Sequence, residues 1–237
     1  MSVLELNAAD QTVTVSASCS CAELYAALPP GLLPPVPPLE LPGGVGGLVT
    51  RGGFGQLFFF SADVLGLTFH SPSGRRIQAG GRTVKNVQGY DLTRLFVGSF
   101  GALGELEQVT LRLRPGHWSA WTGPGGPEAL EQLPAQARFG WLDRVVAPDL
   151  QLRVLFAGPV SSTVTGNATG AGTFADAGTF ADAEPVTQVE DWSARFPRGL
   201  GVATGPAAQV QDARFGWADG GARPDVPPLF QRLAESL

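Results

Sequence analysis

The sequence predicts an α+β fold, because alternating strand patterns and short capped helices both occur along the chain. Residues 12–15 read TVTV, the alternation of polar and β-branched residues that is typical of a strand. Residues 65–69 also alternate, and Pro-Ser-Gly at 72–74 supplies a turn before residues 75–79, which predicts a β-hairpin. A further strand is predicted over residues 109–114, where Val and Leu alternate with Thr and Arg.

The helix signals are short and lie between these strands. Ser20 stands three residues before Glu23, which forms a capping box and predicts a helix from about residue 21 to residue 28. A proline pair at 29–30 ends that helix. We expect a second short helix near residues 92–97. A C-terminal helix follows a proline pair at 227–228, with leucines four residues apart.

Composition excludes several classes of partner. The 237 residues are 43% hydrophobic and 16% charged, as in an ordinary water-soluble globular protein. The formal net charge of −5 and the scattered Lys and Arg residues give no basic stripe for a nucleic acid. No run of 18 apolar residues and no signal peptide are visible, so we expect no membrane span and a cytoplasmic location.

Few side chains suggest catalysis or metal binding. Cys19 and Cys21 are one residue apart, which suits neither a disulfide nor a zinc site, and we interpret them as two buried thiols. His70 lies in the predicted hairpin, where a structural role is favoured over a catalytic one. No nucleophile–base pair, carboxylate pair or metal cluster is recognisable, so no catalytic residue is assigned and no metal is expected.

Two glycine-dense stretches, at residues 43–55 and 80–104, are the chemically suggestive part of the chain. Glycine lets backbone N–H groups approach a ligand closely, although glycine clusters also form ordinary tight turns. Neither stretch contains the phosphate-binding P-loop pattern or the dinucleotide-binding fingerprint. From spacing alone, both the ligand-binding and the turn interpretations stay open.

The second stretch carries a resemblance to a known family. Residues 80–115 read GGRTVKNVQGYDLTRLFVGSFGALGELEQVTLRLRP, and they resemble the end of the FAD-binding domain in vanillyl-alcohol-oxidase-like (PCMH-type) flavoproteins. The most similar branch contains the glycolate oxidase and D-lactate dehydrogenase type subunits. The resemblance implies the second subdomain of a PCMH-type FAD-binding domain at residues 1–115, with a mixed or antiparallel sheet and flanking helices. A smaller α+β region at 116–237 would correspond to the variable cap of that family.

The same resemblance implies FAD as the cofactor and assigns roles to individual residues. A Gly-Gly pair and a G-S-x-G-x-L-G loop line the flavin in this superfamily through backbone contacts, and the K-N-x-x-G-Y-D run lies near the cofactor or braces its loops. For Lys85 and Asp91 an ion pair between loops, and for Tyr90 a half-buried aromatic role, remain alternatives. The implied cofactor-binding residues are Gly46, Gly47, Lys85, Asn86, Gly89, Tyr90, Asp91, Gly98, Ser99, Gly101 and Gly104.

The chain also departs from the family pattern. It begins at the strand that opens the second half of such domains, so we expect the first subdomain, with its pyrophosphate loop, to be missing. Phe100 stands where an acidic residue is common, and Glu105 and Leu106 replace a hydrophobic pair. Three explanations are open: a start codon assigned too late, a partner chain that supplies the missing half, or a protein that has lost its cofactor site.

Two functions therefore compete. The first is an FAD-dependent oxidoreductase subunit resembling glycolate oxidase, which oxidises a small 2-hydroxy acid by hydride transfer to flavin together with other subunits. The second is a non-catalytic or partner-binding subunit that no longer holds FAD alone. The signature between Lys85 and Gly104 favours the first, and the missing subdomain together with Phe100 and Glu105 favours the second.

Overall fold

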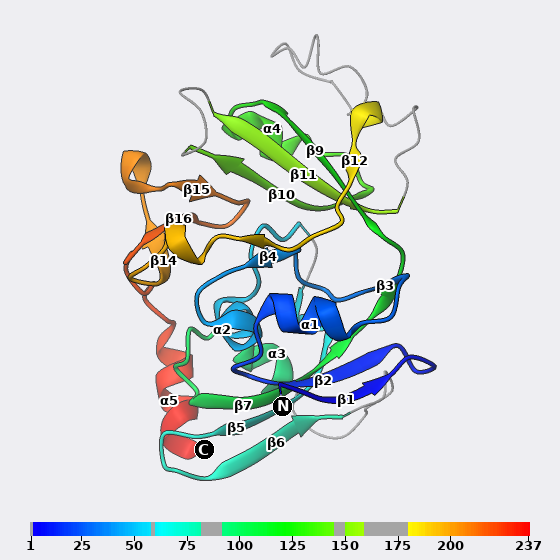
Figure 1. The fold of residues 1–237 in the computed structure, drawn as a ribbon. Coiled ribbons are helices and arrows are strands. Elements are labelled where there is room, and N and C mark those ends of the chain that lie inside the picture. Colours follow the sequence, from blue (N-terminus) through cyan, green and yellow to red (C-terminus); the bar gives the residue numbers. More distant parts are fainter. Residues whose placement is uncertain (1, 58–59, 82–91, 145–149, 159–179) are drawn as a thin grey trace.

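The structure is a computed structural model, and it describes residues 2–57, 60–81, 92–144, 150–158 and 180–237. Within these ranges the strands form two larger antiparallel sheets (Figure 1). The first sheet has five strands in the order β1-β2-β7-β5-β6. Its strands are β1 (Val3–Asn7), β2 (Thr12–Ser16), β5 (Val64–His70), β6 (Arg76–Gly80) and β7 (Glu105–Arg112). The predicted hairpin is confirmed, because β5 and β6 pair in register from Gly66↔Gly80 to His70↔Arg76.

The second sheet is built from later residues. In the described part of the chain its order is β12-β9-β11-β10-β15-β16-β14, seven strands in all. These are β9 (Trp118–Pro124), β10 (Ala137–Asp143), β11 (Gln151–Ala157), β12 (Glu184–Pro185), β14 (Leu200–Ala203), β15 (Val210–Gln211) and β16 (Gly216–Asp219). Two short pairs complete the pattern: parallel β4 (Leu39–Glu40) with β13 (Glu190–Asp191), and antiparallel β3 (Leu32–Leu33) with β8 (Arg114–Pro115).

Short helices flank the sheets, so the predicted α+β class with antiparallel sheets is confirmed. Helices α1 (Cys21–Ala27), α2 (Gly44–Arg51) and α3 (Leu92–Phe96) lie between the two sheets (Figure 1). Helix α4 (Pro127–Glu131) contacts β10, and α5 (Pro228–Ser236) ends the chain. The guanidinium of Arg75, in the β5–β6 turn, donates to the carbonyl oxygens of Ser236 and Leu237. The C-terminal helix therefore returns to the first sheet.

Helix α1 forms as its sequence predicts. The Ser20 hydroxyl accepts a 3.0 Å hydrogen bond from the N–H of Glu23, and the Glu23 carboxylate accepts from the N–H of Ser20 at 2.9 Å. Glu40, from β4, adds a further acceptor to the N–H of Ala22 at 2.9 Å. Three N–H groups near the start of the helix are thus satisfied, which stabilises a helix of only seven residues.

Helix α2 was not expected from the sequence, which left ligand-binding and turn interpretations open for the glycine-dense residues 43–55. Residues 44–51 are helical, with left-handed glycines at both ends. Val45, Leu48 and Val49 share one face and are fully buried. Packing of this apolar face outweighs the poor helix propensity of the glycines, which is why local propensity failed here.

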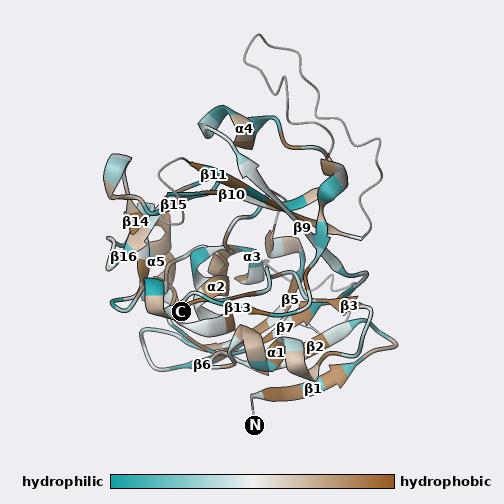
Figure 2. Cartoon of the chain, turned by 45° about the horizontal axis from the view of Figure 1, so that its top comes forward, coloured by the Kyte–Doolittle hydropathy of each residue, from teal (hydrophilic) through white to brown (hydrophobic). Residues whose placement is uncertain are grey.

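One hydrophobic cluster runs through both sheets, and its centre is aromatic. Phe54 lies 5.7 Å from Trp141, 5.9 Å from Trp192 and 6.1 Å from Trp217, measured between ring centroids. At the edge of the first sheet, β1 exposes Leu4 and Leu6, and the strand is coloured as hydrophobic in Figure 2. On α5, Leu233 and Leu237 pack against the core, whereas Leu229 is exposed.

Candidate functional site

The structure brings the two glycine-dense stretches together. The N–H of Gly98 donates to the carbonyl oxygen of Val49 at 3.2 Å, and the N–H of Phe100 donates to that of Thr50 at 2.8 Å. The loop after α2 therefore lies against the loop after α3. A Cβ atom on Gly52 would come within 3.2 Å of the Gly98 Cα, so the two backbones lie close together and a side chain at Gly52 would be crowded.

Ser99 is the most informative residue of the second loop. Its side chain is fully buried, and its Oγ has no hydrogen-bond partner within the part of the chain that the structure describes. A buried hydroxyl without a partner is unfavourable by about 1–3 kcal/mol, so such an atom is a candidate for contact with a ligand. The neighbouring Phe100 has a φ of 51° and packs edge-on against Phe215 at 5.9 Å.

Gly46 and Gly47 lie inside α2. The N–H of Gly46 donates to the carbonyl oxygen of Ala17 at 2.9 Å, and a Cβ there would come within 2.6 Å of that oxygen. Gly47 leaves room for the side chain of Arg51, whose guanidinium lies 3.0 Å from where a Cβ would stand. Burial lowers the pKa of Arg51 from its ordinary value to about 10. Close packing of α2 accounts for both glycines, and their contact with a flavin stays a prediction.

The remaining predicted residues divide into two groups. Gly101 and Gly104 end the second loop with φ of 76° and 133°. A Cβ on Gly104 would clash with the carbonyl oxygen of His70, so only glycine fits there. Five further residues lie outside the described residues, and their roles stay predictions: Lys85, Asn86, Gly89, Tyr90 and Asp91.

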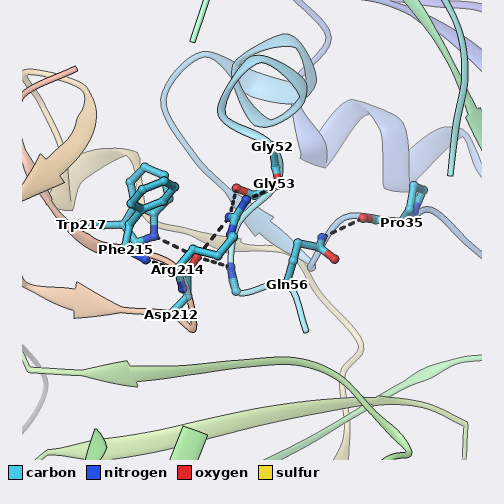
Figure 3. A network of polar contacts seen from close by, with 9 residues as sticks. Pro35, Gly52, Gly53, Gln56, Asp212, Arg214, Phe215 and Trp217 are labelled. Carbon is cyan, nitrogen blue, oxygen red and sulfur yellow. Dashed lines mark hydrogen bonds and ion pairs between the residues drawn. The ribbon is translucent and has the colours of Figure 1, made fainter. Parts of the chain in front are cut away.

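A polar network holds the first loop, and sequence reasoning did not predict it. The guanidinium of Arg214 donates to the carbonyl oxygens of Gly52 and Gly53, the latter at 2.8 Å (Figure 3). The carboxylate of Asp212 is fully buried and accepts from the N–H of Gly55 at 3.0 Å and from Trp217 Nε1 at 2.9 Å. The turn between β15 and β16 thus fixes the glycine-rich loop of the first half (Figure 3).

A weak signal for this network existed. The tetrapeptide RFGW occurs twice, at residues 138–141 and 214–217, and the tryptophans of both copies pack on Phe54. The repeat therefore marks two segments that enclose the same loop. Nothing in the four letters distinguishes Arg214, which binds the loop, from Arg138, which lines a cavity.

The other candidate chemistries are not supported by the described residues. Cys19 and Cys21 are both buried and free, as predicted. His70 lies 3.4 Å from the carboxylate of Glu107 at the sheet surface. Among the described residues, no three His, Cys, Asp or Glu side chains are arranged to hold a metal ion. None of the described helices has the length and apolar character needed to cross a membrane.

Comparisons with known proteins agree with the resemblance in the sequence. Residues 1–80 match the family described as FAD binding domain, and residues 173–220 match a family of unknown function (DUF5639). An uncharacterized FAD-linked oxidoreductase from Mycobacterium tuberculosis is 39% identical over 118 residues, which is 48% of this chain and 26% of that protein. The D-lactate dehydrogenase of Archaeoglobus fulgidus is 36% identical over 121 residues, covering 48% of this chain and 27% of that enzyme.

A shorter match is more similar still. Glycolate oxidase subunit GlcE from Escherichia coli is 44% identical over 52 residues, 22% of this chain and 15% of that subunit. The chain thus spans about a quarter or less of the curated relatives that it matches. Among solved structures, Phl p 4.0202, a glucose dehydrogenase, has a TM-score of 0.47 and 20% identity, with 66% of this chain and 34% of that chain covered.

These matches define the class of protein. Residues 1–80 match the FAD binding domain family, and the chain is similar in sequence to FAD-linked oxidoreductases and to glycolate oxidase subunits. The family supports FAD as the cofactor. Two observations among the described residues bear on such a ligand: the buried Ser99 hydroxyl is without a partner among them, and the loops around Gly52 and Gly98 carry no side chain where they meet.

Proposed function

We propose that this chain is an FAD-binding component of an oxidoreductase resembling glycolate oxidase, whose substrate is a small 2-hydroxy acid. The match to the FAD binding domain supports the cofactor, and relatives named glycolate oxidase and D-lactate dehydrogenase support the substrate class. The observation that carries the proposal is the buried Ser99 hydroxyl, which has no partner among the described residues and lies in the loop that contacts the end of α2.

In this proposal the residues of the chain position the cofactor. When bound, FAD supplies the two-electron acceptor for the hydride of the substrate. The Ser99 hydroxyl hydrogen-bonds a polar atom of the ligand and so removes its own desolvation cost. Arg214 holds the carbonyl oxygens of Gly52 and Gly53 in place, and the contact between Phe100 and Phe215 excludes water from the adjacent loop.

A specific observation favours the alternative, a partner-binding subunit that does not hold FAD alone. The N–H groups of Gly52, Gly53, Gly55 and Gly98 all donate to acceptors of this chain. A pyrophosphate needs several convergent N–H donors, and these four are already used. In the alternative, other subunits of a glycolate-oxidase-like complex supply those donors.

A titration with FAD separates the two functions. The full chain is mixed with FAD, freed of excess cofactor, and examined by visible absorption. We expect flavin bands that remain with the protein, and about a fivefold weaker affinity in Ser99→Ala, since a hydrogen bond of about 1 kcal/mol is lost. Ser236→Ala, at an exposed serine at the end of α5, is the matched control.

Two results would count against the first function. A protein that stays colourless with FAD supplied supports the partner-binding alternative. Flavin binding that is equal in the wild type and in Ser99→Ala shows that the cofactor lies elsewhere.

A further inference from the structure

After β16 the chain leaves the second sheet, and α5 carries it to the first sheet, where it ends (Figure 1). There Arg75 Nη2 donates to the carbonyl oxygen of Ser236 at 3.0 Å, and Arg75 Nε donates to that of Leu237. The last carbonyl oxygens of a helix have no partner within the helix, and a cation also interacts favourably with the negative end of the helix dipole. Arg75 therefore anchors α5 to the turn between β5 and β6.

The two ends of this crossing touch the two ends of the loop after α3, which runs from residue 98 to residue 104. Near the start of the crossing, Phe215 packs edge-on against Phe100 at 5.9 Å. At the other end, a Cβ on Gly104 would stand 3.0 Å from the Cα of Ser71, in the turn that Arg75 belongs to. The chain between Phe215 and the anchored end of α5 thus connects two places that both touch this loop.

Helix α5 is held weakly. None of its residues is fully buried, and Phe230, Leu233 and Leu237 pack against the core as partly buried side chains. Residues 223–226, which lead into the helix, make no hydrogen bond within the described ranges of the chain. In the same ranges, the bonds from Arg75 are the hydrogen bonds that join α5 to the sheets. A segment with few buried contacts and few hydrogen bonds opens at a low cost in free energy.

We propose that residues 223–237 form a detachable strap. The strap covers the loop after α3 while Arg75 holds it, and it exposes that loop when it is released. The inference rests on the proposed function, in which Ser99 of this loop contacts FAD, and it adds how the site opens. Because the Ser99 side chain is fully buried, a ligand reaches its hydroxyl only after a covering segment has moved. The weakly held α5 is that segment.

The first test needs no cofactor and uses hydrogen exchange of the full chain, followed by mass spectrometry. Arg75 is exposed, so Arg75→Gln removes the anchor without disturbing the core. We expect backbone N–H groups of α5 and of the loop after α3 to exchange about fivefold faster, since about one net hydrogen bond is lost. The loop reporters are the hydrogen-bonded N–H groups of Phe100, Ala102 and Gly104. Arg232→Gln, at an exposed arginine of α5, is the matched control and should change neither segment.

Leu233→Ala provides an independent variant, because it weakens the packing of the strap and leaves Arg75 in place. The same two segments should again exchange faster. Exchange in β2, a buried strand of the first sheet, should stay unchanged in all variants, since release of a strap is a local opening.

The kinetics of FAD binding test the link to the proposed function. Arg75→Gln should raise the association and the dissociation rate about fivefold each and leave the Kd nearly unchanged, because a strap limits passage in both directions. A weaker affinity at an unchanged association rate would contradict this gating. If the chain does not bind FAD at all, the proposed function fails, and the hydrogen exchange still decides whether the strap exists.

Three exchange results would overturn the proposal. The first is faster exchange in α5 with unchanged exchange in the loop after α3, which would show that α5 does not cover this loop. The second is equal exchange of both segments in the wild type, Arg75→Gln and Leu233→Ala. The third is faster exchange in β2 as well, which would indicate a general loss of stability in place of a local opening.

Discussion

The carboxylate of Asp212 accepts a 3.0 Å hydrogen bond from the backbone N–H of Gly55, 157 residues earlier in the chain. The same carboxylate accepts from the N–H groups of Arg214 and Phe215 at 2.8 and 2.9 Å. One buried anion therefore organises both its own turn and the loop that follows α2. The conformation of the predicted cofactor loop depends on residues of the second sheet.

Asp212→Asn should destabilise the protein strongly. The amide NH2 of asparagine would face N–H donors that now meet a carboxylate oxygen, and Arg214 would lose its buried partner. We expect a loss of about 3 kcal/mol in the free energy of unfolding, measured with urea. Asp225→Asn, at an exposed position, should change it by about 0.5 kcal/mol or less. Equal effects of the two substitutions would show that the network contributes nothing to stability.

A pair of glycine substitutions separates steric contact from backbone strain. Gly104→Ala places a Cβ against the carbonyl oxygen of His70 at a φ of 133°. Gly74 has a φ of 83°, and no atom lies within 4 Å of the Cβ that Gly74→Ala would add. We expect a loss of about 3 kcal/mol or more at Gly104 and about 1–2 kcal/mol at Gly74, compared by urea unfolding. Equal losses would mean that the loop relaxes away from His70.

The sequence predicts the elements that depend on neighbouring residues. The capping box of Ser20 and Glu23 and the β5–β6 hairpin are local patterns, and both are present as predicted. Helix α2 was not predicted, because burial of its apolar face, a tertiary effect, determines its conformation. The contact between Asp212 and Gly55 joins residues too distant for any local pattern to indicate.

The candidate site also combines features that the local sequence indicates with features that depend on the folded structure. The resemblance indicated Ser99 and Gly98 correctly as part of one loop, since a contiguous motif contains them. It did not indicate that Gly46 is required for packing on Ala17, because a motif does not distinguish a glycine that approaches a ligand from one that approaches a backbone. Only the packed structure separates these two uses of glycine.

The two cysteines should be unreactive in the folded protein. Burial, with Glu23 and Glu40 adding to it, raises the pKa of Cys19 from 9.0 to about 11, and burial raises that of Cys21 as well. The reactive thiolate is therefore about a hundredfold scarcer at pH 8 than for an ordinary thiol. We expect negligible reaction with a disulfide reagent at pH 8 in the native protein, and two equivalents of reaction in guanidinium chloride.

The raised pKa of Cys19 also determines the direction in which the stability of the fold changes with pH. A thiol whose pKa is raised by folding contributes stability that is complete below the unfolded value near 9. That contribution is lost as the pH rises through about 11. Rapid reaction of both thiols in the native protein at pH 8 would contradict their burial.

Substitution of Phe54 tests whether the two halves of the chain unfold together. The residue belongs to the first half, and its ring is enclosed by Trp141, Trp192 and Trp217 from the second. Phe54→Ala removes a fully buried ring and should cost about 3–5 kcal/mol, because the tryptophans cannot fill the cavity completely. The measurement is urea unfolding followed by both tryptophan fluorescence and far-ultraviolet circular dichroism.

If one core joins the halves, both signals shift to lower urea by the same amount and remain coincident. Leu229→Ala, an exposed leucine of α5, is the matched control and should leave both midpoints in place. Two separated transitions, of which only one responds to Phe54→Ala, would show instead that residues 1–115 and 116–237 unfold independently. That result would make the predicted boundary a true domain boundary, and the Asp212–Gly55 bond would then be a contact between two domains.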